Sequence, residues 1–169
     1  MANKTSEKRK IDIVLDQYND DHQHSFNKAV QYVCVPLLAF GLLGIVWSIP
    51  FPHLNFLGRY NGFVNWASFL IAFSIYYYYK LSPVLSYGIL LVVFAFSAAI
   101  VSLEKLHTNP NWPPMGQVCL GVFIVGLIFQ IWGYTRESKT PSVADQFRSL
   151  LNGPLWLMCE LFKRINIPC

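Results

Sequence analysis

The chain has few charged residues. Only 13% of its 169 residues are Asp, Glu, Lys or Arg, whereas 54% are hydrophobic. A soluble domain usually carries about 25% charged residues, and a chain of this size cannot bury so much apolar surface in one core. The composition therefore argues against an ordinary soluble domain and indicates a multi-pass membrane protein.

Several familiar motifs are also missing. The sequence contains no Gly-rich phosphate loop, no HExxH and no GxSxG. The polar residues 1–21 hold no apolar h-region, which argues against a cleavable signal peptide. No two cysteines form a CxxC pair, and their spacing matches no zinc pattern. We therefore expect free thiols in or near the membrane at Cys34, Cys119, Cys159 and Cys169.

Four apolar stretches are long enough to cross the hydrocarbon core of a membrane. They are predicted as transmembrane helices over about residues 29–49, 62–79, 83–103 and 115–134, because a helix rises 1.5 Å per residue and the hydrocarbon is about 30 Å thick. The turn between the second and third stretches is so short that these two must be antiparallel neighbours. The prediction is an all-α, polytopic membrane protein with one membrane domain over residues 1–169.

Both ends of the chain have amphipathic segments. Within the predicted cytosolic segment 1–28, apolar residues recur at helical spacing from Ile11 to Tyr18, beside several lysines and an arginine. This helix would lie on an anionic membrane surface or pack on the protein's own cytosolic face. Residues 144–167 combine an apolar stripe with charges and an Asn-Gly-Pro interruption. They predict an interfacial or re-entrant segment, with a fifth span as the alternative.

The distribution of basic residues predicts the orientation in the membrane. With four spans, both termini share one side with eleven of the 13 basic residues, and only Arg59 and Lys105 lie opposite. The positive-inside rule then places both termini in the cytosol. The net charge of +4 follows this one face, which favours anionic lipid over nucleic acid as a partner.

Two polar clusters meet the membrane on that same side. His24, Asn27 and Gln31 are spaced i, i+3 and i+7, so they share one face of a helix. Asn27 is a candidate helix cap, and His22 can join this face only if the chain breaks near Ser25.

The second cluster consists of Gln130, Tyr134 and Glu137, spaced i, i+4 and i+7. Gln130 should face the bundle, because an unpaired amide in lipid is costly. The two clusters predict either one polar pocket at the cytosolic membrane surface or a set of caps and interhelical hydrogen bonds.

At these clusters the sequence resembles the small membrane proteins related to yeast 2-hydroxy-fatty-acid dioxygenase, a family long catalogued as a domain of unknown function. The resemblance covers roughly residues 12–168. It rests on Tyr18 followed by HQHSFNKAVQYVCVPLL, on FQIWGYTRESKTPS and on DQFRSLLNGPLWLMCELF. It implies histidine-held Fe(II), use of O₂ and removal of one carbon from 2-hydroxy fatty acids in α-oxidation; imidazole suits iron. It also implies a bacterial inner membrane or the endoplasmic reticulum.

The family pattern is met only in part. The residues that match it are His22, Asn27, Lys28, Gln130, Gly133 and Glu137. At two further positions the pattern has histidines, whereas this chain has Gln31 and Tyr134. Two expected iron ligands are therefore replaced. His24 is a candidate substitute for one of them, since it shares a helical face with Gln31.

The resemblance implies a role for each of these positions. The predicted Fe(II) ligands are His22, which the resemblance implies, and His24, the candidate substitute. The residues at the catalytic positions are Gln31, Tyr134 and Glu137. The residues implied to contact the substrate are Asn27, Lys28, Gln130, Arg136 and Lys139, the three cations being candidates to meet a fatty-acid carboxylate.

Three functional hypotheses follow. The chain is an active dioxygenase with a shifted iron site, or a metal-free family member that binds lipid or a membrane partner, or a bundle whose polar residues are structural. The resemblance favours a dioxygenase-like membrane protein acting on 2-hydroxy fatty acids, while the replaced histidines favour the metal-free alternative for its chemistry.

Overall fold

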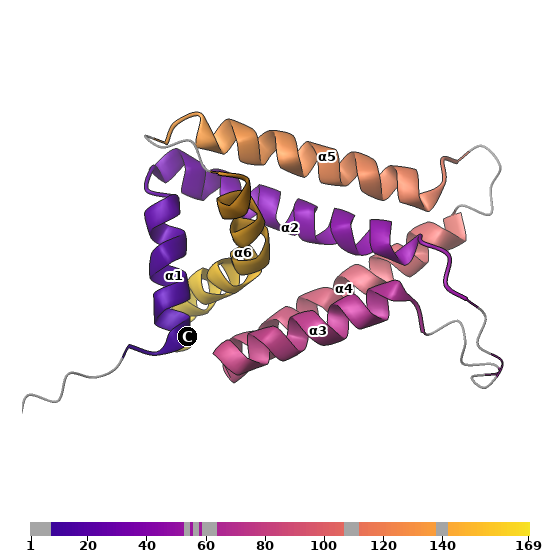
Figure 1. Cartoon of the computed structure of the whole chain (residues 1–169), viewed down its shortest axis with the longest axis horizontal. Helices are drawn as coiled ribbons and strands as arrows, with labels where there is room; N and C mark the ends of the chain where they lie inside the picture. Colours follow the sequence, from indigo (N-terminus) through magenta and orange to yellow (C-terminus); the bar gives the residue numbers. More distant parts are fainter. Residues whose placement is uncertain (1–7, 53–54, 56–57, 59–63, 107–111, 138–141) are drawn as a thin grey trace, which may run out of the picture.

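The fold is helical throughout the part of the chain that the structure describes. The structure is a computed structural model and describes residues 8–52, 55, 58, 64–106, 112–137 and 142–169. Within these residues it contains no strand, which confirms the all-α prediction. Its helices are α1 (Lys10–Asp21), α2 (Ser25–Trp47), α3 (Trp66–Leu81), α4 (Pro83–Leu106), α5 (Met115–Tyr134) and α6 (Val143–Arg164) (Figure 1).

Three of these helices are long and apolar enough to cross a membrane. They are α2, α4 and α5, with 23, 24 and 20 residues, so each spans about 30–36 Å at 1.5 Å per residue. The chain is therefore an integral membrane protein. Helix α3 has 16 residues and starts at Trp66, because Asn65 and Ser68 form a capping box at its first turn. The predicted start at residue 62 lies outside the described residues, and the four-span count stays a prediction.

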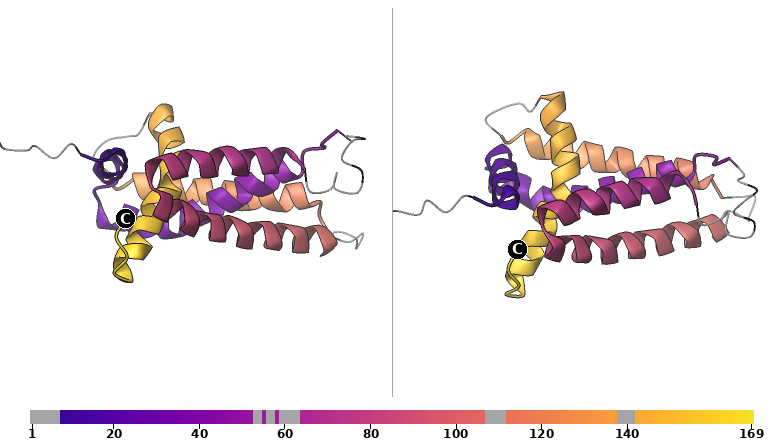
Figure 2. Two further views of the ribbon diagram at one scale, coloured as in Figure 1. Left: turned by 90° about the horizontal axis from the view of Figure 1, so that it is seen from below. Right: turned by 60° about the horizontal axis from the view of Figure 1, so that its bottom comes forward.

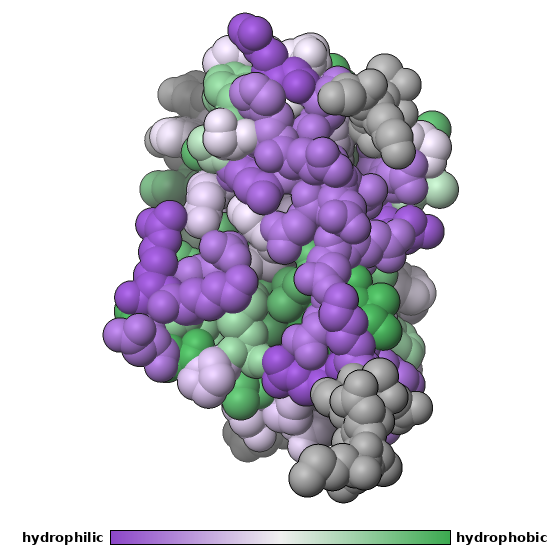
Figure 3. All heavy atoms as spheres, turned by 90° about the vertical axis from the view of Figure 1, so that its left-hand side faces the viewer, coloured by the Kyte–Doolittle hydropathy of each residue, from purple (hydrophilic) through white to green (hydrophobic). Residues whose placement is uncertain are grey.

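The helices are arranged in two directions. Helices α2 to α5 run lengthwise, while α1 and α6 lie across one end of them (Figures 1 and 2). As predicted, α3 and α4 are antiparallel neighbours, since only Ser82 separates them, and its N–H donates to the Tyr78 carbonyl. Seen from the end where α1 and α6 lie, the surface is largely hydrophilic (Figure 3).

Helices α2 and α5 approach each other closely through glycines. A Cβ built on Gly41 would lie 2.8 Å from the Cα of Phe123, and one on Gly44 would overlap the sulfur of Cys119. On the α5 side, a Cβ on Gly126 would lie 3.0 Å from Leu38. Small residues that let two backbones meet are typical of helix pairs within membranes. This contact fixes α5 against α2 along most of its length (Figure 1).

Helix α6 corrects the predicted interruption at Asn-Gly-Pro. The helix runs unbroken through Pro154, although a proline removes one backbone hydrogen bond. The chain stays helical because this segment is packed: Gly153 faces Val35 of α2, with only 2.9 Å from a built Cβ to a Val35 methyl. Among the described helices, α6 is not one of those apolar enough to span a membrane. Its interfacial placement stays a prediction.

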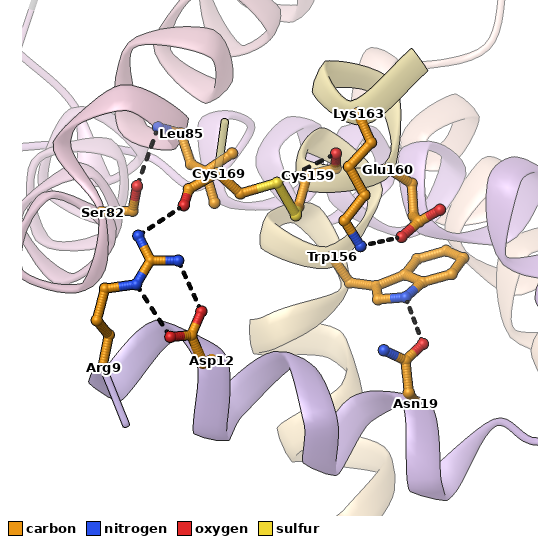
Figure 4. The surroundings of a disulfide bond; sticks show 10 residues. All are labelled: Arg9, Asp12, Asn19, Ser82, Leu85, Trp156, Cys159, Glu160, Lys163 and Cys169. Atoms are coloured by element: carbon orange, nitrogen blue, oxygen red, sulfur yellow. Dashed lines mark hydrogen bonds and ion pairs between the residues drawn. A yellow bond between two sulfur atoms is a disulfide. The ribbon is translucent and has the colours of Figure 1, made fainter. Parts of the chain in front are cut away.

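The expectation of four free cysteines is wrong for two of them. Cys159 on α6 and Cys169 at the end of the chain form a disulfide (Figure 4). The chain turns back after α6, where Asn166 has a φ of 58° and the Ile167 N–H donates to the Phe162 carbonyl. Sequence spacing does not show such a reversal. Cys34 and Cys119 are buried free thiols.

Candidate functional site

The site begins at the corner between α1 and α2. Helix α1 ends at Asp21 and α2 begins at Ser25, so the chain breaks close to the point required for His22 to meet the α2 face. His24, and not Asn27, is the N-cap of α2: its Nδ1 accepts the Phe26 N–H at 3.1 Å. The expectation that Asn27 caps the span is therefore wrong.

His22 is fully buried at this corner. Its Nδ1 lies 2.8 Å from the Tyr18 carbonyl oxygen, and because a carbonyl can only accept, Nδ1 carries the proton. The other nitrogen, Nε2, is then an acceptor, and the hydroxyl of Ser149 on α6 lies 3.4 Å from it. The imidazole stacks on the Tyr18 ring at 4.3 Å and faces the Tyr134 ring at 5.4 Å between centroids.

The surroundings keep His22 neutral. Burial lowers the pKa of the imidazole below its usual value, and the positive charge of Lys28 acts in the same direction. The hydrogen bond to the Tyr18 carbonyl and the negative charges of Asp21 and Glu137 act in the opposite direction and are the weaker influence. A neutral imidazole with a defined acceptor nitrogen thus faces the interior of the cluster.

We predict that acid weakens this corner. The unfolded chain takes up a proton at His22 near pH 6.5, whereas the folded protein does so only at lower pH, because burial lowers the pKa. The free energy of unfolding should therefore be constant well above pH 6.5 and fall as the pH drops through that value. Thermal unfolding of the purified protein from pH 7.5 to 5.5 measures this.

His22→Gln should reduce that pH dependence, because it removes the buried imidazole. An equal slope in wild type and His22→Gln would show that another group is responsible.

A chain of hydrogen bonds, buried at its α1 end, links α1, α2 and the residues after α5. The Tyr18 hydroxyl donates to Gln31 Oε1 at 3.0 Å, and Gln31 Nε2 donates to Asn27 Oδ1 at 3.2 Å. Asn27 Nδ2 then donates to Glu137 Oε1 at 2.9 Å. The same carboxylate oxygen accepts the His24 N–H at 3.0 Å. Glu137 therefore holds the first turn of α2 in place.

The α5 side of the cluster is also buried. Gln130 faces the bundle, as its polarity in a membrane helix requires, and its amide donates to the Tyr134 hydroxyl at 3.4 Å. Gly133 leaves room for Asn27, whose side-chain oxygen would overlap any Cβ at this position. Among the described residues, no buried side-chain nitrogen or oxygen lacks a hydrogen-bond partner. The cluster is a closed and satisfied network.

Two contributors from α6 are absent from the sequence-based site. Ser149 is buried beside His22, and Trp156 stacks on Tyr18 while its Nε1 donates to Asn19 Oδ1 at 3.0 Å. Both residues lie within a segment that carries the family resemblance. However, spacing within one helix cannot show which helix will cover the corner.

Other predicted site residues lie at the rim or away from it. His24 is exposed and its Nδ1 is occupied by the cap, so it does not join His22 as a second ligand. Lys28 is half-buried and Arg136 is exposed. Lys139 lies outside the described residues. In the part of the chain that the structure describes, no three His, Cys, Asp or Glu side chains are grouped so as to hold a metal ion.

A family model described as "2-hydroxy-palmitic acid dioxygenase Mpo1-like" matches residues 9–165. The chain belongs to the Mpo1-like family. This match contains all six described helices, and the family's name points to a function like that of a 2-hydroxy-fatty-acid dioxygenase. No curated protein and no solved structure matches the chain.

The polar cluster of this Mpo1-like chain does not fit a ferrous site. Non-haem iron in oxygenases is commonly held by two imidazoles and a carboxylate, with open positions for O₂ and substrate. Here Nε2 of His22 lies 3.4 Å from the Ser149 hydroxyl, and the imidazole ring packs against the rings of Tyr18 and Tyr134. The nearby carboxylate of Glu137 is bound to Asn27 and to the backbone of His24. The corner thus offers a metal ion one imidazole nitrogen, that of His22.

Proposed function

We propose that this chain is an Mpo1-like membrane protein that binds 2-hydroxy fatty acids, or acyl lipids of the same class, without the family's ferrous chemistry. One observation carries this proposal. Gln31 and Tyr134 stand where the family pattern has histidines. Gln31 accepts a hydrogen bond from Tyr18, and Tyr134 accepts one from Gln130. The Gln31 bond joins α1 to α2, and the Tyr134 bond lies within α5. Both positions are thus taken up by internal hydrogen bonds, which leaves His22 as a lone imidazole.

Cations at one end of α2 and α5 support a fatty-acid carboxylate as the ligand group. Lys28 lies in the first turn of α2, and Arg136 lies two residues after the end of α5. Because α2 and α5 lie side by side (Figure 1), both cations belong to the same end of the helix pair. An acyl chain would lie along the apolar helices, and the carboxylate would meet these cations at the membrane surface. Lys139 is a third cation of this proposed set.

The proposal includes the predicted orientation. Four spans and two cytosolic termini place this site at the cytosolic surface of the membrane. The largely hydrophilic end face formed around α1 and α6 supports this placement (Figure 3), because such a surface suits water and lipid headgroups.

A second candidate function is a dioxygenase with an altered iron site. The geometry of His22 favours it: metal-binding imidazoles commonly donate from one nitrogen to a backbone carbonyl, which fixes the tautomer and orients the other nitrogen. His22 does this through its contact with the Tyr18 carbonyl.

Two measurements on the detergent-solubilised protein test the proposal. After anaerobic loading with ferrous iron, elemental analysis should find no more iron in wild type than in His22→Ala. 2-Hydroxypalmitic acid should bind saturably, and Lys28→Gln with Arg136→Gln should weaken this binding about tenfold, or about 1.4 kcal/mol. Lys80→Gln is the matched control, because Lys80 lies in the last turn of α3, over the Tyr76 ring.

Each measurement can contradict one part of the proposal. About one iron per chain that is lost in His22→Ala would establish the second candidate, with a metal bound through an imidazole. An absence of saturable fatty-acid binding would show that the ligand class is wrong.

A further inference from the structure

The end of the chain is tied to the start of α1. The disulfide joins Cys169 to α6, and the Cys169 carbonyl accepts a hydrogen bond from Arg9 Nη1 at 3.0 Å (Figure 4). The same guanidinium forms a two-pronged contact with the Asp12 carboxylate, at 2.9 and 2.8 Å. The tail thus connects the C-terminal part of α6 to the start of α1.

Contacts between α1 and α6 lead from the disulfide to the polar cluster. Cys159 and Ile11 belong to one buried apolar group. One turn away from Cys159 on α6, Trp156 bonds to Asn19 and stacks on Tyr18, and Tyr18 stacks on His22. Any change in how α6 holds α1 therefore reaches the surroundings of His22.

The two cysteine residues differ in exposure. Cys159 is buried, with 1% of its surface exposed, whereas Cys169 is half-buried. A cavity of about 260 Å³ opens beside the disulfide, and its wall includes both cysteines, Arg9, Asp16 and Lys163. A small thiol in this polar cavity would reach the sulfur of Cys169 before that of Cys159.

The predicted cytosolic location would supply small thiols for such an attack. If the termini lie in the cytosol, as the charge distribution predicts, the disulfide faces a pool of small thiols. Disulfides at cytosolic surfaces are usually transient, catalytic or redox-sensing. A purely structural disulfide would instead require an oxidising compartment on this side of the membrane.

We propose that the Cys159–Cys169 disulfide is an exchange site for a small thiol of the glutathione class, and that its opening releases the tail and loosens α1 over the polar cluster. The thiolate of the small thiol attacks Cys169 Sγ. The protein disulfide breaks, Cys159 leaves as a thiolate and takes a proton, and a mixed disulfide forms on Cys169. This site is independent of the proposed lipid function.

A second small thiol completes the reduction. Its thiolate attacks the small-thiol sulfur of the mixed disulfide, which releases Cys169 as a thiolate and forms the oxidised dimer of the small thiol. The two electrons that reduce the protein thus come from two small thiols, each of which also releases a proton. The reverse sequence, with the oxidised dimer as oxidant, closes the disulfide again.

The test uses the full chain in lipid nanodiscs with glutathione buffers of stepped redox ratio. Samples are acid-quenched and alkylated, and mass spectrometry locates each modification. We expect a glutathione adduct on Cys169 and none on Cys159. On reduction, amide exchange in α1 should rise about tenfold, the change expected for a helix that loses part of its docking, while exchange in α5 should stay constant.

Cysteine variants separate exchange from general loss of structure. Cys169→Ser should show fast exchange in α1 at every redox ratio, whereas Cys119→Ser should respond as wild type does, because Cys119 is a buried free thiol on α5. Two results would overturn the proposal: the adduct on Cys159, or an unchanged α1 after reduction.

Sealed membrane vesicles test the sidedness. A membrane-impermeant thiol added to the cytosolic face should open the disulfide. Opening only from the opposite face would identify a structural disulfide in an oxidising compartment and would also overturn the proposal.

Discussion

Gly41→Ala is expected to destabilise the protein by about 3 kcal/mol, the upper part of the usual range for overpacking a buried contact. The added methyl group would lie 2.8 Å from Cα, Cβ and N of Phe123. Two of these are backbone atoms of α5, so no side-chain rotation can relieve the overlap and the two helices must separate. Thermal unfolding of the purified protein in detergent measures the loss.

Gly121→Ala is the matched control for this substitution. Gly121 also lies on α5, but a Cβ built there has no neighbour within 4 Å, so the free energy of unfolding should change by less than about 0.5 kcal/mol. If the two variants were equally stable, the close glycine contact between α2 and α5 would not be what holds this pair together.

Gln31→His combined with Tyr134→His is expected to create ferrous binding at about one ion per chain, with an affinity at least about 100-fold above wild type. The ring of Tyr134 lies 5.4 Å from that of His22, and both Gln31 and His22 contact Tyr18. The two substitutions would therefore place three imidazoles around one buried corner. Iron content after anaerobic loading measures the gain.

The control pair adds the same number of imidazoles in a different arrangement. Gln31→His with Ile131→His directs one imidazole outward, because Ile131 is 60% exposed on α5. Adding His22→Ala to the first pair should remove the gain. Equal iron in the two pairs would mean that binding is adventitious and that the corner does not preserve the geometry of a family metal site.

The long helices were predictable because the length of each apolar run can be counted in the sequence. The start of α2 was not predictable, and the position of this start determines whether His24 belongs to the helix. Its spacing to Asn27 and Gln31 places it on their face only if the helix already includes it, whereas the helix starts at Ser25 and His24 becomes the cap. A helix boundary is the least certain part of any pattern-based assignment.

In the polar cluster too, residues placed by their own helix were predictable, whereas residues placed by packing between helices were not. Gln130 was expected to face the bundle because of the cost of an unpaired amide in lipid. Ser149 and Trp156, in contrast, enter the site through the docking of α6 across the helix ends. The pairing of Cys159 with Cys169 depends on a chain reversal after α6. Neither arrangement follows from periodicity, since both depend on how separate elements pack.

The contact between α2 and α5 also constrains biosynthesis. Helix α2 leaves the ribosome first, but α5 follows only after residues 48–114 have been made. Until then Asn27 and Gln31 lack the carboxylate of Glu137 and the enclosure by α5 and α6. A nascent or truncated chain that ends before α5 therefore presents two amides of a membrane helix without their final surroundings. Exposed polar groups of this kind are what membrane quality control would encounter in an incomplete copy of this protein.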